Sequence, residues 1–266
     1  MTELSLADGF AALNRGDLAT AGEACKKALA ANQKHVPAHF LVGLVALEGK
    51  QRQVAHEAFK SVVTLDRDHA AAWAHLAKLN VGEGRIAAAE SALREVRRIQ
   101  PSDPMVIELT GTVLNSLGEY EAAELFFERA HQMVPQSPSA LMNLGNVRVF
   151  LGKIDEAVAL FKRAIELEPN SAQCHWGLAN SEKAKDDSHI KTMQGLIDSG
   201  RQSKRSQGFL HYAIGKENED LGNWADAFSA FTQGAQARRE TVEFSEADEA
   251  AMFEACLLYT SRAHET

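Results

Sequence analysis

The chain has 266 residues, is 45% hydrophobic and carries a formal net charge of −8. This negative charge argues against binding to nucleic acid, which requires a basic surface. The three cysteines are scattered and odd in number, which predicts free thiols in a reducing compartment. We see no signal peptide and no apolar run of about 18 residues, and therefore expect a cytoplasmic protein without a membrane span.

A unit of 34 residues recurs without insertion through residues 2–171. Each unit reads as two short helices joined by a turn, because apolar residues recur at three- and four-residue spacing in each half. The units begin at Thr2, Val36, Ala70, Pro104 and Pro138. A helix pair that recurs at a fixed period predicts an all-helical stack, in which each pair contacts mainly its neighbours.

Two positions of the unit hold small residues, which we expect where the two helices of a pair cross, because a large side chain would push the helix axes apart. The eighth position is Gly9, Gly43, Ala77, Gly111 or Gly145. The twentieth position is Ala21, Ala55, Ala89, Ala123 or Ala157. The twenty-fourth position carries the side chain that fills the space beside this crossing: Cys25, Phe59, Leu93, Phe127 or Phe161.

Glycine marks the expected turn between the two helices of a unit. In the fifth unit Gly152 is placed for a left-handed helix cap, and Asp155 for capping the helix that follows. In the second unit the turn falls to Gly49, one place early. The second helix of the fifth unit is expected to end before Pro169, since proline cannot continue a helix.

The regular pattern breaks after residue 171. The stretch AQCHWGLANSEKA predicts a first helix that contains His175, but the helix HIKTMQGLID follows where a regular second helix is expected. Lys191 stands there in place of the small residue, so we expect this helix to pack at a different angle. Gly208 starts another regular unit, in which Trp224 is expected to pack rather than to recognise a partner. Ser245 is the predicted N-cap of a last helix.

The 34-residue pattern resembles the tetratricopeptide repeat family. The resemblance implies an all-α, right-handed superhelical solenoid of helix-turn-helix repeats. We expect five regular repeats over residues 2–171, an irregular repeat over 172–207 and a last repeat over 208–241.

The order of the C-terminal parts is similar to that in a narrower group, the bacterial repeat-containing sulfotransferases. The resemblance lies in DDSHI, LHYAIGKENEDLGNWADAFSAFTQGAQARR and VEFSEADEAAMFEA, within residues 172–255. In that group the repeats precede a catalytic domain that uses 3′-phosphoadenylyl sulfate. This chain has no PRSGTT-like phosphate loop, so we expect no catalytic residue and no cofactor in it. Residues 242–255 then begin a helix that leads to a missing domain.

The last eleven residues, 256–266, have an unusual origin in our interpretation. CLLYTS back-translates to DNA that looks like a transposase end used to fragment DNA for sequencing, and RAHET fits the adapter that follows it. We expect this tail to be non-native. A genuine short helix is the alternative.

In the family, the first helices form a concave face that binds peptides or partner proteins, and five positions of each repeat point there. Amide side chains there both donate and accept hydrogen bonds, which suits an extended peptide. An exposed amide that serves only solubility is the alternative. The candidate groove residues are His75, Lys78, Asn143, Asn146, Trp176, Asn180 and Lys183. The pattern of a carboxylate clamp is not met, and no histidine has the spacing of a metal ligand.

Two functions remain open from the sequence. One is the substrate- or partner-docking part of a truncated sulfotransferase, and the other is a stand-alone adaptor with no associated enzyme. A stand-alone enzyme is disfavoured, because no nucleophile–base or metal constellation is found. The partner, the sulfated substrate and the oligomeric state are left open.

Overall fold

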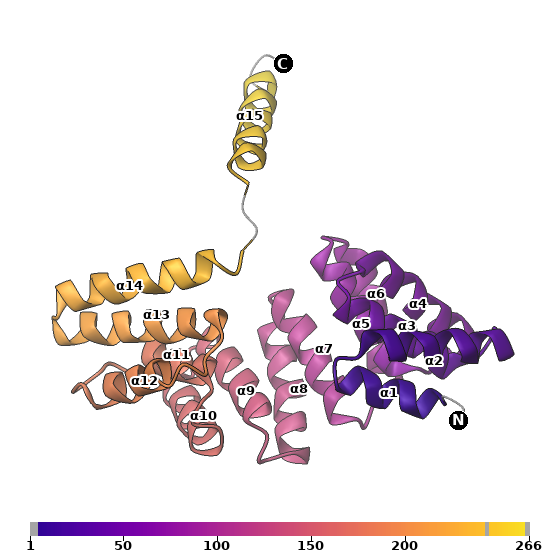
Figure 1. Ribbon diagram of the computed structural model, residues 1–266, viewed down its shortest axis with the longest axis horizontal. Coiled ribbons are helices and arrows are strands. Elements are labelled where there is room, and N and C mark those ends of the chain that lie inside the picture. The colour runs from indigo at the N-terminus through magenta and orange to yellow at the C-terminus, as the bar shows by residue number, and fades with distance from the viewer. Residues whose placement is uncertain (1–4, 243–244, 264–266) are drawn as a thin grey trace. The chain divides into compact units, whose positions relative to one another are not determined.

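The computed structural model describes residues 5–242 and 245–263, and these residues form fifteen α-helices and no strand (Figure 1). The all-helical prediction is therefore confirmed. The chain divides into two compact units, unit 1 (Met1–Leu160) and unit 2 (Phe161–Thr266). Among the described helices, none combines the length and the hydropathy that crossing a membrane would require.

Unit 1 is a stack of helix pairs. Helix α1 packs on α2, α3 on α4, α5 on α6 and α7 on α8, and each pair also contacts the next one. This is the predicted solenoid arrangement, in which neighbours bury each other's apolar faces. The helices are α1 (Leu6–Asn14), α2 (Leu18–Ala31), α3 (Val36–Glu48), α4 (Arg52–Leu65), α5 (Ala70–Gly82), α6 (Ile86–Ile99), α7 (Pro104–Ser116), α8 (Tyr120–Met133), α9 (Pro138–Phe150) and α10 (Ile154–Leu167), whose second half belongs to unit 2.

The close approach of paired helices is confirmed at the predicted small residues. A Cβ atom added to Gly43 would lie 2.5 Å from Cε1 of Phe59, and one added to Gly111 would lie 2.7 Å from Cε1 of Phe127. Both distances are too short for real atoms, so only glycine fits beneath these rings. The alanines at the twentieth position are fully buried: Ala21, Ala55, Ala89, Ala123 and Ala157.

The turns follow the glycine pattern with one exception. Gly152 has a φ of +75° and provides the predicted left-handed cap. In the second unit Gly49 has a φ of −75°, and Lys50 takes the left-handed conformation instead, with a φ of 57°. The prediction that Gly49 makes this turn is therefore wrong. Asp155 is not the N-cap either, because α10 begins one residue before it and places Asp155 in its first turn.

Unit 2 begins with a shortened repeat. Helix α11 (Ala172–Ser181) has 10 residues, against 13 in α9, and so ends before Lys183. Helix α12 (Ser188–Asp198) packs on α13 (Lys204–Leu221), with Met193 fully buried between elements of this unit. Helix α13 pairs with α14 (Trp224–Arg239), where the ring of Phe231 lies against Gly215.

Two apolar features of unit 2 are exposed. The side chain of Trp224, at the start of α14, is 67% exposed, so the prediction that it packs is wrong. Helix α15 (Glu246–Ala263) begins directly after the predicted N-cap Ser245. It runs without a break through the expected boundary at residue 255, and its described side chains are exposed. Residues 264–266 of the expected tail lie outside the described residues.

Candidate functional site

The first helices of unit 1 line a groove with a volume of about 1130 Å³. Its walls come from α1, α3 and α5, the turns after α1 and α3, and the first residue of α4. In these three pairs the first helix faces the groove, whereas α7 and α9 contribute no lining residue. The lining residues are Leu13, Asn14, Gly16, Leu44, Leu47, Glu48, Lys50, Arg52, His75, Lys78, Leu79 and Gly82.

The lining of this groove combines leucines with positive charge. Four leucines give it an apolar surface, while Lys50, Arg52 and Lys78 outnumber the one acidic residue, Glu48. All three cationic side chains are exposed, in a protein whose formal net charge is −8. The groove therefore suits a ligand that carries both apolar and acidic groups.

His75 contributes a flat, neutral surface to the groove. Its ring stacks on that of Phe59, with the centroids 4.7 Å apart and the planes 5° from parallel. Burial, assisted by the nearby charges of Lys78 and His69, lowers the pKa of His75 to about 4, so the ring is neutral near pH 7. Its Nδ1 atom is buried and bonds to no described residue.

Asn143 and Asn146 lie on α9, elsewhere in unit 1. The Nδ2 atom of Asn143 donates a hydrogen bond to Oε1 of Glu108 on α7, over 2.8 Å. Asn146 is half-buried. Neither asparagine lines the groove of about 1130 Å³. Because Asn143 is already bonded to Glu108, a peptide would have to compete for one of its donors.

The other three predicted residues belong to unit 2. Trp176 on α11 is 38% exposed and meets the ring of Phe209 edge-on, with the centroids 5.8 Å apart. The Nδ2 atom of Asn180 donates to the carbonyl of Trp176, over 2.7 Å, within its own helix. Lys183 follows the end of α11 and is exposed. The structure thus divides the predicted residues between the two units.

A chain of hydrogen-bonded side chains in unit 2 was not predicted, because no spacing in the sequence points to it. His175 is fully buried, and its Nε2 atom lies 2.8 Å from the carbonyl oxygen of Pro169. Its Nδ1 atom lies 2.7 Å from Nε2 of His189 on α12. The Nδ1 atom of His189 lies 2.5 Å from Oε1 of Glu217 on α13. We call these three side chains the histidine relay.

The carbonyl of Pro169 determines where the protons of the relay lie. A carbonyl only accepts, so Nε2 of His175 carries a hydrogen. Burial lowers the pKa of His175 and favours its neutral form, so its Nδ1 accepts from Nε2 of His189. One further proton must then lie between Nδ1 of His189 and the carboxyl group of Glu217. The relay fixes α12 against α11 and α13.

A cavity of about 380 Å³ borders the relay at His189 and Glu217. Lys162 and Glu182 form an ion pair in its wall, with 2.6 Å between Nζ and Oε2. Lys183 and Asp186 also line it. The wall mixes both signs of charge, and no group of three His, Cys, Asp or Glu in the described part of the chain could hold a metal ion.

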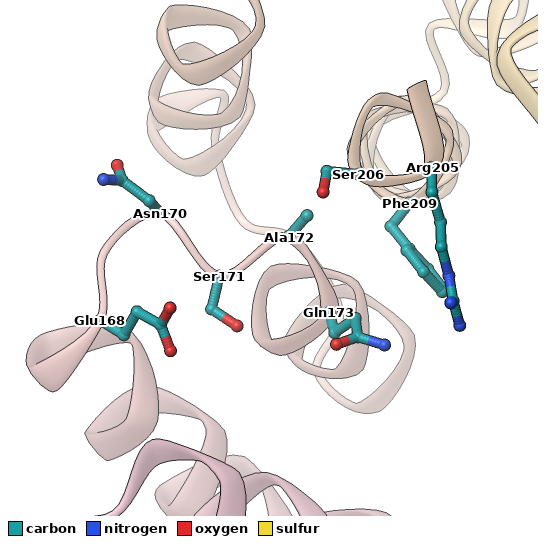
Figure 2. Close-up of a pocket in the computed structure, with 8 residues that line it drawn as sticks. All are labelled: Glu168, Asn170, Ser171, Ala172, Gln173, Arg205, Ser206 and Phe209. Carbon is teal, nitrogen blue, oxygen red and sulfur yellow. The ribbon is translucent and has the colours of Figure 1, made fainter. Parts of the chain in front are cut away.

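A hollow of about 300 Å³ lies at the start of α11. Figure 2 shows its lining, with Arg205 and Phe209 side by side on α13 and Glu168 across the hollow, directly after the end of α10. None of its residues has a buried side-chain polar atom without a hydrogen bond. The groove of unit 1 is the better candidate for a binding site, because it is larger. Its leucines and basic side chains also suit a ligand that carries apolar and acidic groups.

Comparisons with known proteins agree with this architecture. A family model of the tetratricopeptide repeat matches residues 46–111 and 114–181. No curated protein matches the chain. Among solved structures, YrrB, described as a tetratricopeptide repeat protein with an unusual peptide-binding site, has a TM-score of 0.51 at 16% identity and covers 78% of this chain and 97% of its own.

Two further solved structures extend the likeness. TTC0263, a thermophilic repeat protein of Thermus thermophilus, has a TM-score of 0.56 at 22% identity, over 66% of this chain and 96% of its own. Human IFIT1, solved as a dimer with PPP-AAAA, has a TM-score of 0.67 at 15% identity, over 93% of this chain and 60% of its own. At these identities the likenesses show the fold alone.

Proposed function

We propose that this chain is a scaffold that binds a peptide or a partner protein in the concave groove of unit 1. The chain belongs to the tetratricopeptide repeat family, and the proposal rests on that membership and on the groove itself. The observation that carries this proposal is the groove of about 1130 Å³, lined by leucines and by basic side chains. Its size suits several residues of a peptide better than a compact metabolite. YrrB, which shares the fold, is described as having a peptide-binding site.

His75 and Lys78 are the predicted residues that we place in contact with the peptide. The neutral ring of His75 offers a flat surface for an apolar side chain, and Lys78 offers a charge to an acidic one. Asn143 and Asn146 would extend the binding surface along α9. Trp176, Asn180 and Lys183 would contribute a separate surface in unit 2.

A narrower proposal concerns what this scaffold serves. We propose that the chain is the repeat region of a bacterial sulfotransferase and that it docks substrates or partners for a catalytic domain beyond residue 255. The support is the resemblance of residues 172–255 to that group. A stand-alone cytoplasmic adaptor is the alternative. The genomic sequence after codon 255 separates them: a phosphate-loop motif supports the enzyme, and a stop codon supports the adaptor.

Peptide binding is tested by selecting peptides from a display library on the immobilised full chain. Selected peptides should bind the free chain in solution, as measured by fluorescence anisotropy. Lys78→Glu should weaken that binding, whereas Lys60→Glu, an equal charge change on the exposed side of α4, should leave it unchanged. If no peptide is selected, or if both variants bind equally well, the proposal is wrong.

A further inference from the structure

We infer that the groove of unit 1 in one copy of the chain binds the acidic segment Glu246–Ala255, the start of α15, from a second copy. The inference rests on the proposed function of the groove and names its ligand. It joins two features of the chain, a basic apolar groove and an exposed acidic apolar helix.

The segment carries acidic and apolar residues together. Four of its ten residues are acidic, Glu246, Asp248, Glu249 and Glu254, in the sequence EADEAAMFEA. Within the segment, Met252 is 57% exposed and Phe253 is 61% exposed. Large apolar side chains at such exposure mark a surface that another protein can cover.

The helical spacing brings these two kinds of side chain onto one face. Glu249, Met252 and Phe253 stand at positions i, i+3 and i+4, and residues at this spacing are neighbours on a helix surface. Glu246 stands one turn before Glu249 on the same side. One face of α15 therefore presents carboxylates and apolar side chains to the same partner.

The groove offers the matching groups. Lys50, Arg52 and Lys78 are placed to pair with the acidic residues of the segment, and the leucines of α1, α3 and α5 to cover Met252 and Phe253. Neutral His75 adds no positive charge near pH 7 but widens the apolar surface. Complementary charge steers the encounter, while the apolar contacts hold the complex.

A second copy is the occupant to which we commit. In the structure the described side chains of the segment are exposed, so its apolar face is available to another molecule. Groove and segment are different surfaces of one chain, so contact between copies is head-to-tail. Head-to-tail contacts produce assemblies that grow with protein concentration unless they close into a ring.

The test uses a labelled peptide of sequence SEADEAAMFEA, residues 245–255, and the full chain. We expect saturable binding by fluorescence anisotropy, weaker at higher salt. The triple variant Lys50→Glu, Arg52→Glu, Lys78→Glu should bind at least about tenfold less tightly. Lys60→Glu on α4 is the control for reversing one exposed charge outside the groove and should bind like the unmodified chain. A peptide with Met252→Ala and Phe253→Ala should lose most of its binding.

Analytical ultracentrifugation of the full chain tests the second copy. Self-association should increase with concentration and be abolished by Glu249→Lys with Phe253→Ala in α15. If library-selected peptides bind but residues 245–255 do not, the inference is wrong and the proposed function stands. If neither binds, both are wrong. Binding within one chain would give a different result: the full chain would stay monomeric, and the α15 variant would bind the labelled peptide more tightly than the unmodified chain does. That result would overturn the inference.

Discussion

The Nδ1 atom of His175 lies 2.7 Å from Nε2 of His189, and the backbone carbonyl of Pro169 decides which of the two rings donates. Because the carbonyl takes the Nε2 hydrogen of His175, His189 must donate to Nδ1 of His175, and a proton is needed again between His189 and Glu217. The hydrogen bonds that join α11, α12 and α13 therefore require one particular placement of protons on these side chains.

Replacing Glu217 tests this pattern. Glu217→Ala removes a buried partner of His189, and we expect it to lower the free energy of unfolding by about 1–3 kcal/mol. Glu217→Gln should cost much less, because its amide N–H can donate to Nδ1 of neutral His189. Urea denaturation followed by circular dichroism measures both, and hydrogen exchange should localise the loss to α12. Glu219→Ala, exposed on the same helix, is the control.

The pKa of His75 predicts a pH-dependent stability. Burial lowers this pKa from 6.5 to about 4, so the unfolded chain binds a proton at a higher pH than the folded one. The contribution of neutral His75 to the free energy of unfolding is complete above pH 6.5 and is lost as the pH falls from 6.5 towards 4. At pH 4.5 the loss from His75 should be about 2–3 kcal/mol.

His75→Phe removes this proton-binding group and keeps an aromatic ring against Phe59. The unfolding free energy of the variant minus that of the unmodified chain should increase as the pH falls below 6.5. The same difference should stay constant between pH 7 and 9. Urea denaturation at each pH measures it. A difference that does not change with pH would contradict the assignment of a lowered pKa to His75.

Gly43 tests the packing on which the repeat depends. In Gly43→Ala the new Cβ would lie 2.5 Å from the Phe59 ring, and overpacking should cost about 1–3 kcal/mol. Gly22→Ala is the control, since no atom lies within 4 Å of its added Cβ and alanine favours the interior of α2. Thermal melts compare the two variants. Adding Phe59→Leu to Gly43→Ala should lower the cost of the alanine, because a smaller side chain then faces it.

Lys50 tests the turn that the sequence analysis misplaced. It holds a φ of 57° where four other repeats of the 34-residue pattern have glycine: Gly16, Gly84, Gly118 and Gly152. Lys50→Gly should therefore stabilise the chain by about 0.5–1 kcal/mol. Gly152→Ala should destabilise it by about 1 kcal/mol, because alanine is strained at a φ of +75°. A lower melting temperature for Lys50→Gly would refute this account. The same variant should weaken binding of residues 245–255, so stability and binding should change in opposite directions.

The local pattern of residues was sufficient to predict the helices and their pairing. A crossing of two helices admits only small side chains, and it recurs every 34 residues, so Gly43 and Ala55 reveal it without coordinates. The structure differs from the prediction at single residues, such as the turn at Lys50. Lys50 adopts the left-handed conformation at the position that glycine holds in four other repeats, so the turn keeps its place in the repeat although the residue there is not glycine.

The site is different, because its residues gain their properties from neighbours distant in the sequence. His75 could be placed at the groove from its position in the repeat, but its low pKa comes from burial against Phe59, and burial is a property of the folded stack. The relay joins His175, His189 and Glu217 from three helices, one of which departs from the repeat pattern. Periodicity determines which residues face one another within a pair. Only the packing of the irregular helix α12 brings these three side chains together, because hydrogen bonds require distances near 3 Å that no spacing in the sequence sets.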